Sequence, residues 1–328
     1  MRLRRVLESL TLVLFASIAA VRGLQNSAGV LEPPLDGDHR RFQWRGVDVA
    51  YTEAGEPSDP TLVLLHGINA AGSSGEFREV FADLAADYDW APEDFVLTDL
   101  PGFGCSDRPP LRYSATFYEE FVAAFLSEFD EPQVLASSLT GAYVVKTARR
   151  DPDLVADLTL VCPTAVAGPE PPKTALRELL RAPVVGELIH GVLVSKPSIR
   201  YFNSDHGYYG ADQPSTAWED YEWQTGHQPN ARHAVASFVA GFLNADASLG
   251  ATLADLNQAG VKTTLVWGRE AEITPLAEGR ALAEEADCRL VVIDDTKLLP
   301  HVEFPDAVVS VLRGGQLAPE SAAEERAG

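Results

Sequence analysis

The residues best suited to chemistry lie in the stretch 131–146, where an apolar run meets a helical pattern. The run ends in the small residues Ser137 and Ser138, and apolar residues at helical spacing follow at once. A strand that turns this sharply into a helix would hold the hydroxyl of Ser138 on strained backbone above a sheet. A serine in such a place can act as a nucleophile if a base and oxyanion donors lie beside it.

The match to the pattern G-x-S-x-G around Ser138 is loose. Ala136 and Thr140 stand where that pattern has glycines. The alternative interpretation is a strand that ends in a polar turn, with Ser137 or Thr140 capping the next helix. If the turn is the sharp one, Thr140 should be buried, with its hydroxyl bonded to the backbone.

Strands and helices alternate on both sides of this stretch, which predicts an α/β fold. The first two strands, 42–46 and 47–52, should form a hairpin through Arg45-Gly46. The other apolar runs predict buried parallel strands. We expect those strands at 61–65, 95–98, 157–162, 263–267 and 289–293, and core helices at 75–87, 115–129, 275–286 and 302–312. The alternation predicts a mostly parallel sheet that is covered on both faces.

The alternation breaks between residues 166 and 245, where helical stretches such as 174–180 and 231–243 occur without a clear strand. We interpret this block as a helical cap over the carboxyl edge of the strands, where ligands bind in open α/β sheets. The predicted parts of the chain are a basic and apolar leader or anchor (1–30), the first half of the core (31–165), the helical cap (166–245), the second half of the core (246–314) and an acidic disordered tail (315–328).

The order of the motifs resembles that of the α/β-hydrolase family in its capped, esterase-like form. A strand ends in His66-Gly67, residues 99–107 match D-x-P-G-x-G-x-S-D, and a later strand ends in Trp267-Gly268. The resemblance covers about residues 40 to 313. It implies the α/β-hydrolase fold and a hydrolase that acts on a small apolar ester or related bond.

The resemblance also implies roles for single residues. Ser138 would be the nucleophile, and the backbone N–H groups of Ile68 and Leu139 would bind the oxyanion. His66 would shape its loop and take no part in proton transfer.

Two positions depart from the family pattern. The usual acid position after Trp267-Gly268 holds Ala271, and the usual histidine position holds Leu298. His301, three residues further on, is then the candidate base, since a triad is recognised by geometry and not by position. The candidate acid is Glu270, with Glu272 as the alternative. Four histidines of the predicted cap could also reach Ser138 from above, although each is more simply a surface or packing residue: His190, His206, His227 and His233.

The composition is strongly acidic. The chain of 328 residues has 48 acidic and 26 basic residues, a net charge of −22, and only five lysines. Dispersed acids of this number are typical of proteins that stay soluble in high salt, where screening removes self-repulsion. They argue against nucleic-acid binding, which needs basic patches. Three widely spaced cysteines and scattered histidines predict no disulfide framework, no metal site and no cofactor.

The first 21 residues join a basic start to a short apolar stretch from residue 10 to 21. This pattern is typical of a signal or signal-anchor segment, yet twelve apolar residues are short for a bilayer span. An amphipathic helix that packs on the domain or lies on a membrane is an equal alternative. The protein is therefore expected to be membrane-associated or exported through this segment, and otherwise cytoplasmic.

Three functions stay open from the sequence. The first is an esterase-like hydrolase with a rearranged triad. The second is a catalytically silent protein that keeps the pocket and binds a small apolar ligand. The third is a membrane-associated interaction protein, which predicts an exposed apolar patch on the cap.

Overall fold

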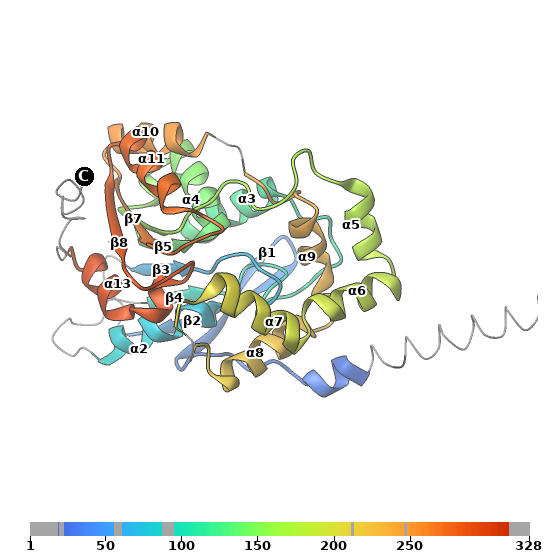
Figure 1. The fold of residues 1–328 in the computed structure, drawn as a ribbon. Coiled ribbons are helices and arrows are strands. Elements are labelled where there is room, and N and C mark those ends of the chain that lie inside the picture. The colour runs from blue at the N-terminus through green and yellow to red at the C-terminus, as the bar shows by residue number, and fades with distance from the viewer. Residues whose placement is uncertain are drawn as a thin grey trace, which may run out of the picture.

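A single twisted sheet of eight strands forms the centre of the molecule (Figure 1). The computed structural model describes residue 19 and residues 23–55, 61–86, 95–210, 213–245 and 248–314. The strand order is β1-β2-β4-β3-β5-β6-β7-β8. The strands are β1 (Asp38–Trp44), β2 (Val47–Ala54), β3 (Leu62–Leu65), β4 (Phe95–Thr98), β5 (Gln133–Ser137), β6 (Asp157–Val161), β7 (Lys262–Gly268) and β8 (Arg289–Ile293).

The first two strands form the predicted hairpin. They are joined by Arg45 and Gly46, whose φ angles of 52° and 78° are both positive, as a two-residue hairpin turn of matching twist requires. The pairs β1–β2 and β2–β4 are antiparallel, and the remaining pairs are parallel. The sheet is therefore mostly parallel, as the sequence predicts.

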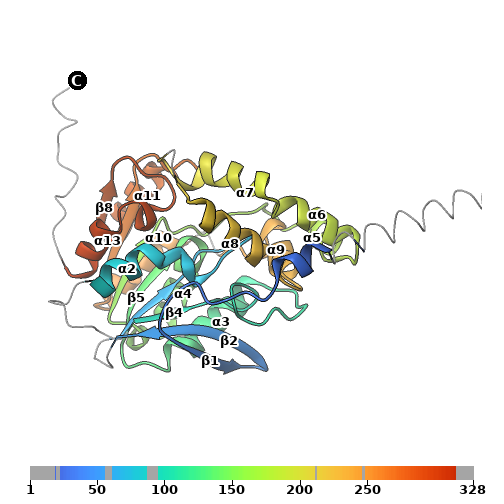
Figure 2. The ribbon, with the colours of Figure 1, turned by 90° about the horizontal axis from the view of Figure 1, so that it is seen from below.

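The parallel strands are buried because helices cover both faces of the sheet. Alternate residues of β3 enter opposite cores: Val63 and Leu65 pack on one side, Leu62 and Leu64 on the other. Helices α3, α4 and α10 cover the first side, and α2 and α13 cover the second (Figures 1 and 2). The helices of these layers are η1 (Ser74–Phe77), α2 (Arg78–Ala86), α3 (Ala115–Leu126), α4 (Ser138–Arg150), η2 (Pro152–Leu154), α10 (Leu249–Gln258), α11 (Leu276–Ala286), α12 (Pro300–Glu303) and α13 (Pro305–Leu312).

A group of helices is inserted between β6 and β7 and lies to one side of the sheet (Figure 2). The described residues between 170 and 240 contain no strand, as the sequence predicts. We call these elements the inserted helices: α5 (Thr174–Arg181), α6 (Val185–Leu193), α7 (Lys196–Phe202), η3 (Asn203–Gly207), α8 (Thr216–Gly226) and α9 (Arg232–Val239).

The two ends of the chain lie largely outside the described residues. Of the leader up to residue 21, only residue 19 is described, and the tail 315–328 is not. Residues 23–28 form a short helix. Within the described ranges, every helix is too short or too polar to cross a bilayer.

Candidate active site

Ser138 lies between the last residue of β5 and the body of α4. Its φ of 53° is left-handed, a conformation that costs energy for a residue with a side chain and that marks sharp functional turns. The side chain is half-buried, and its hydroxyl makes no hydrogen bond to a described residue. The turn therefore holds a serine with a free hydroxyl at the carboxyl end of a central strand.

Thr140 stabilises this turn through a hydrogen bond to the end of the neighbouring strand. It is fully buried, and its hydroxyl donates to the backbone carbonyl of His66, with a distance of 2.7 Å. That carbonyl follows β3, the neighbour of β5 in the sheet. Thr140 therefore joins two adjacent strand ends, which explains how a β-branched residue is accommodated at a position where glycine is usual.

His66 is a structural residue, as the sequence predicts. Its Nε2 accepts a hydrogen bond from the N–H of Leu100 at 3.0 Å. The proton must then be on Nδ1, which donates to the carbonyl of Gly67 at 2.7 Å. Both ring nitrogens are used, so His66 is not available as a base.

A buried contact between the carboxyl of Glu76 and the ring of His301 lies beside the turn. Glu76 is on η1, and its Oε1 is 3.0 Å from Nε2 of His301 on α12. Burial raises the pKa of the Glu76 carboxyl, but His301, His66 and Ser137 together outweigh burial and the pKa is lowered. The two atoms are within hydrogen-bond distance, although their alignment is poor. Nδ1 of His301 has no hydrogen-bond partner among the described residues.

Gly67 shows how near this pair is to Ser138. A Cβ at Gly67 would lie 3.3 Å from Glu76 Oε2, 3.2 Å from Ser137 Oγ and 3.3 Å from Ser138 Cβ. The N–H of Gly67 donates to Glu76 Oε2 at 3.0 Å. Only glycine leaves room for the carboxylate and the serine turn to approach each other so closely.

The loop 99–107 holds η1, and with it Glu76, in place. One carboxylate oxygen of Asp99 accepts from the N–H of Ser74 and the other from the N–H of Cys105, each at 2.6 Å. Gly104 has no room for a side chain, because a Cβ would lie 2.0 Å from the Asp99 carboxyl. The motif D-x-P-G-x-G-x-S-D therefore acts as a scaffold for the first residue of η1.

The proposed oxyanion donors lie next to the same turn. Ile68 directly follows Gly67, and its backbone N–H makes no hydrogen bond to a described residue. Leu139 is in the first turn of α4, where backbone N–H groups have no partner within the helix. Both residues are buried.

Glu270 is placed differently from the sequence prediction. Its carboxylate accepts from the N–H of Thr296 at 3.1 Å, and its own N–H donates to the Thr296 carbonyl. It forms no ion pair with His301 among the described residues, and Glu272 is exposed. The acid that contacts His301 is Glu76, which the sequence analysis did not identify. Its one signal was its place at the start of a predicted core helix, 75–87.

Ala271 and Leu298 occupy the usual triad positions as apolar residues. Ala271 is buried in the core on one side of the sheet, and Leu298 is half-buried against the same core. The structure therefore contains no acid or base at either place.

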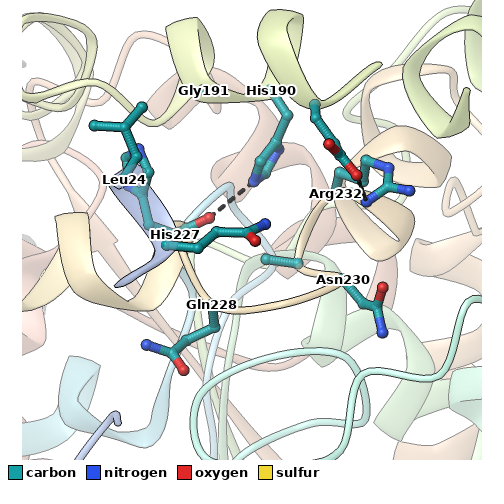
Figure 3. A pocket seen from close by; sticks show the side chains of 11 residues that line it. Leu24, His190, Gly191, His227, Gln228, Asn230 and Arg232 are labelled. Atoms are coloured by element: carbon teal, nitrogen blue, oxygen red, sulfur yellow. Dashed lines mark hydrogen bonds and ion pairs between the residues drawn. The ribbon is translucent and has the colours of Figure 1, made fainter. Parts of the chain in front are cut away.

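The four histidines of the inserted helices are engaged elsewhere. His190 Nε2 donates to the Gly226 carbonyl at 2.9 Å, and His227 Nδ1 to the Trp223 carbonyl at 2.8 Å. Burial lowers the pKa of His190 to about 4. Both rings line a cavity of about 30 Å³, room for one water molecule, against the helix 23–28 (Figure 3). His233 is buried, and His206 lies 3.3 Å from Asp205, so all four are packing or surface residues.

Glu222 on α8 is a second acid that the sequence did not reveal. Burial raises its pKa to about 7, although Asn203 Nδ2 donates to its Oε2 at 2.7 Å. Arg78 of α2 also acts on this carboxyl and packs over the ring of Trp218, at 4.1 Å from its centroid. These contacts join α8 to the first residue of α2, which directly follows η1.

Glu303 attaches α12 to the inserted helices. Its Oε1 accepts from the N–H groups of Tyr209 and Gly210 at 2.9 and 2.8 Å, and its Oε2 accepts from the Thr296 hydroxyl at 2.8 Å. His301, on the same short helix, is therefore held in a fixed position.

Metal ligands do not gather in the part of the chain that the structure describes: no group of three His, Cys, Asp or Glu side chains could hold an ion. A larger cavity of about 400 Å³ lies at the opposite, amino edge of the sheet. It is lined by the first residues of β5 to β8, Gln133, Asp157, Lys262 and Arg289. It is thus remote from Ser138.

The comparisons with known proteins identify the family and the fold. The alpha/beta hydrolase family matches residues 62–311, so the chain belongs to that family. An uncharacterised hydrolase of Saccharomyces cerevisiae is 41% identical over 64 residues, which is 20% of this chain and 20% of that protein. The chain thus matches only about a fifth of the length of that curated relative.

Solved structures share the fold at low sequence identity. A serine hydrolase involved in carbazole degradation has a TM-score of 0.66 at 16% identity, over 85% of this chain and 98% of that one. A membrane phospholipase A has a TM-score of 0.65 at 21% identity, over 95% of this chain and 94% of that one. An esterase from Rhodococcus has a TM-score of 0.62 at 22% identity, over 84% of this chain and 97% of that one. At these identities the likeness establishes the fold alone.

Proposed function

We propose that the protein is a slow serine hydrolase of small, apolar, ester-like substrates. Ser138 is the nucleophile, His301 the base, Glu76 the acid that orients it, and the N–H groups of Ile68 and Leu139 bind the oxyanion. The observation that supports this most is the buried Glu76–His301 pair next to the strained serine turn. Glu76 takes the role that the sequence analysis assigned to Glu270.

The chemistry follows from these positions. The Ser138 hydroxyl attacks the carbonyl carbon while His301 accepts its proton, and the backbone donors bind the negative oxygen. His301 then gives the proton to the leaving alcohol, and water hydrolyses the acyl-serine by the same path. Because Nε2 of His301 faces Glu76, Nδ1 is the nitrogen left for the serine proton. Slow turnover is the expectation because apolar residues, Ala271 and Leu298, stand at the usual acid and base positions, so activation of Ser138 depends on the rearranged pair.

The test compares two acids in matched variants. Hydrolysis of short p-nitrophenyl esters should be lost in Ser138→Ala and His301→Ala. Glu76→Gln should lower kcat by about 10³–10⁴, as loss of the orienting acid does in triads, while Glu270→Gln should change it less than threefold. The proposal fails if Glu270→Gln is the damaging variant, or if activity survives His301→Ala or Ser138→Ala.

A catalytically silent protein that binds a small apolar ligand is the second candidate. It is favoured by the free Ser138 hydroxyl and by apolar residues at both usual triad positions. In that case the parent is inert towards esters and organophosphates. The double substitution Leu298→His and Ala271→Asp should then create esterase activity, because the turn and the oxyanion donors would already be in place. A double variant that stays inert while folded would mean that the site itself is not formed.

A further inference from the structure

Ser137 is the last residue of β5 and stands at the N-cap position of α4, but it does not cap that helix. A serine at an N-cap usually accepts a hydrogen bond from a backbone N–H of the first helical turn. The backbone of Ser137 is extended, with φ −107° and ψ 143°, yet its side chain makes no such bond. The side chain is also buried, with only 2% of the residue exposed. The Ser137 hydroxyl therefore has another partner inside the protein.

That partner is the carboxylate of Glu76. A Cβ at Gly67 would lie 3.2 Å from Ser137 Oγ and 3.3 Å from Glu76 Oε2, so both oxygens face the same small space beside Gly67. The Ser137 hydroxyl donates a hydrogen bond to this carboxyl, which favours the ionised form and lowers the pKa of Glu76. Glu76 Oε1 has no hydrogen-bond partner among the described residues, so the bond belongs to Oε2.

The two oxygens of the Glu76 carboxylate thus have different neighbours. Oε2 lies beside two neutral donors, the Ser137 hydroxyl and the N–H of Gly67 at 3.0 Å. Oε1 faces Nε2 of His301 at 3.0 Å. A carboxylate whose one oxygen is held by two donors cannot turn freely about its last bond. The donors at Oε2 therefore fix the direction in which Oε1 points.

Three titratable side chains face this carboxyl from other elements. The rings of His301 on α12 and of His66 after β3 both act to lower its pKa. The phenol of Tyr208, which follows η3, lies within electrostatic range of Glu76, and burial raises the pKa of that phenol, so that it stays neutral. Ser137 acts on Glu76 together with these groups, but it is a neutral donor that a single substitution removes without changing the charge of the site.

We propose that Ser137 is a positioning residue whose hydroxyl holds the Glu76 carboxylate so that Oε1 faces His301. This role rests on the proposed function, because Ser137 acts through Glu76 and His301 and takes no part in the attack on the substrate. The two adjacent serines then have separate roles: Ser138 reacts, and Ser137 orients the acid.

The first test is the pH dependence of p-nitrophenyl acetate hydrolysis by the full-length protein. Ser137→Ala should move the acid limb of the kcat profile to higher pH by about one unit, because the Glu76–His301 pair binds a proton more tightly when the carboxylate loses a donor. On the plateau kcat should fall about tenfold, with KM changed less than about twofold. Ser137→Thr retains the hydroxyl and suits extended backbone, so it should restore the parent profile.

Ser73→Ala is the matched control. Ser73 is also 2% exposed and stands three positions before Glu76, but its hydroxyl has no hydrogen-bond partner among the described residues. Its loss should leave kcat and the acid limb as they are in the parent. A shift of the acid limb in Ser73→Ala equal to that in Ser137→Ala would mean that the loss of any buried hydroxyl here disturbs the site, and would overturn the proposal.

A second measurement does not need activity. In urea unfolding, the loss of unfolding free energy between pH 7 and pH 3 should be smaller in Ser137→Ala than in the parent, because the pKa of Glu76 then lies nearer its ordinary value of 4.5. In a Glu76→Gln background, Ser137→Ala should leave the pH dependence of stability unchanged, since no carboxyl remains for the hydroxyl to act on.

The two measurements separate failure of this role from failure of the proposed function. If the parent hydrolyses the ester while Ser137→Ala moves neither the acid limb nor the pH dependence of stability, Ser137 does not position Glu76 and the proposed function stands. If the parent is inert but unfolding shows the coupling of Ser137 to Glu76, the contact is real and the proposed function fails, and the catalytic role of Ser137 fails with it. Labelling of Ser137 in place of Ser138 by an organophosphate would overturn both.

Discussion

Glu76 and His301 are both buried, and each polar side chain is stabilised in the core by the other. A buried charge is tolerated when it is paired, and removing one partner leaves the other uncompensated. The pair is fixed from both sides, by Gly67 on the glutamate and by the ring of Phe77 at 5.2 Å from that of His301. It is therefore a structural element as well as the proposed source of proton transfer.

The pair predicts a pH-dependent loss of stability on the acid side. Because His301 lowers the pKa of Glu76 below its ordinary value of 4.5, the stabilisation is present above pH 4.5 and is lost as pH falls through the lowered value. Glu76→Gln should cost about 3 kcal/mol at pH 7. Urea unfolding of parent and variant should show that this cost becomes smaller below pH 4.

Glu284→Gln, at an exposed position of α11, is the control and should cost less than about 0.5 kcal/mol. An equal cost of Glu76→Gln at pH 3 and pH 7 would show that the charge of Glu76 does not stabilise the fold.

Thr140 predicts a second effect at this scale. Thr140→Val keeps the shape but leaves the buried His66 carbonyl without its donor, which should cost about 1–3 kcal/mol in unfolding free energy. Thr140→Ser retains the hydroxyl and should cost clearly less. If the two variants were equally stable, the hydrogen bond at 2.7 Å would not support the turn.

At the scale of elements, polar contacts hold the inserted helices on the core. Glu303 joins α12 to the backbone at Tyr209 and Gly210, and Lys297 Nζ donates to the carbonyls of Ser204 and Asp205. Glu222 of α8 adds a carboxyl buried against α2. Polar contacts of this kind specify the position of these helices on the core.

Glu222 makes this junction sensitive to pH. Burial raises its pKa to about 7, so the folded state binds a proton more tightly than the unfolded state, and stability falls as pH rises from about 4.5 to 7. Glu222→Gln removes this penalty. The free energy of unfolding of the variant minus that of the parent should be about 2 kcal/mol larger at pH 8 than at pH 5. This figure is already lowered because the residue is partly exposed. Urea unfolding at both pH values measures the difference. Stability profiles of the two proteins that run parallel would contradict the expectation.

At the scale of the whole molecule, the excess of acids dominates. A net charge of −22 repels itself at low ionic strength, and salt shortens the Debye length from about 10 Å at 0.1 M to about 3 Å at 1 M.

The melting temperature should therefore rise between 0.1 M and 2 M KCl, and continue to rise after ordinary screening is complete (beyond about 1 M). The melting temperature measured in sodium sulfate at the same ionic strength as KCl distinguishes charge screening, which depends on ionic strength, from a general salting effect, which depends on the kind of salt. A melting temperature that stays flat in KCl would remove the high-salt interpretation.

Much of the fold could be predicted because local patterns specify it. The apolar runs at 95–98 and 289–293 became β4 and β8 with the predicted bounds, and the hairpin followed from Arg45-Gly46. Helices with irregular apolar spacing were not predicted, among them α8 and α10. Their positions depend on packing against α2 and α4 and not on their own periodicity.

The sequence by itself determined the family, the serine turn and the loss of the usual acid and base positions, because each follows from residue types at fixed spacing. Only the tertiary structure decided which acid meets His301. Glu76 and His301 are 225 positions apart in the chain, and no periodicity links them. They meet because β3 and β8 end at the same edge of the sheet, and because Asp99, Gly67 and Glu303 hold the loops after those strands so that the buried carboxylate of Glu76 faces the ring of His301.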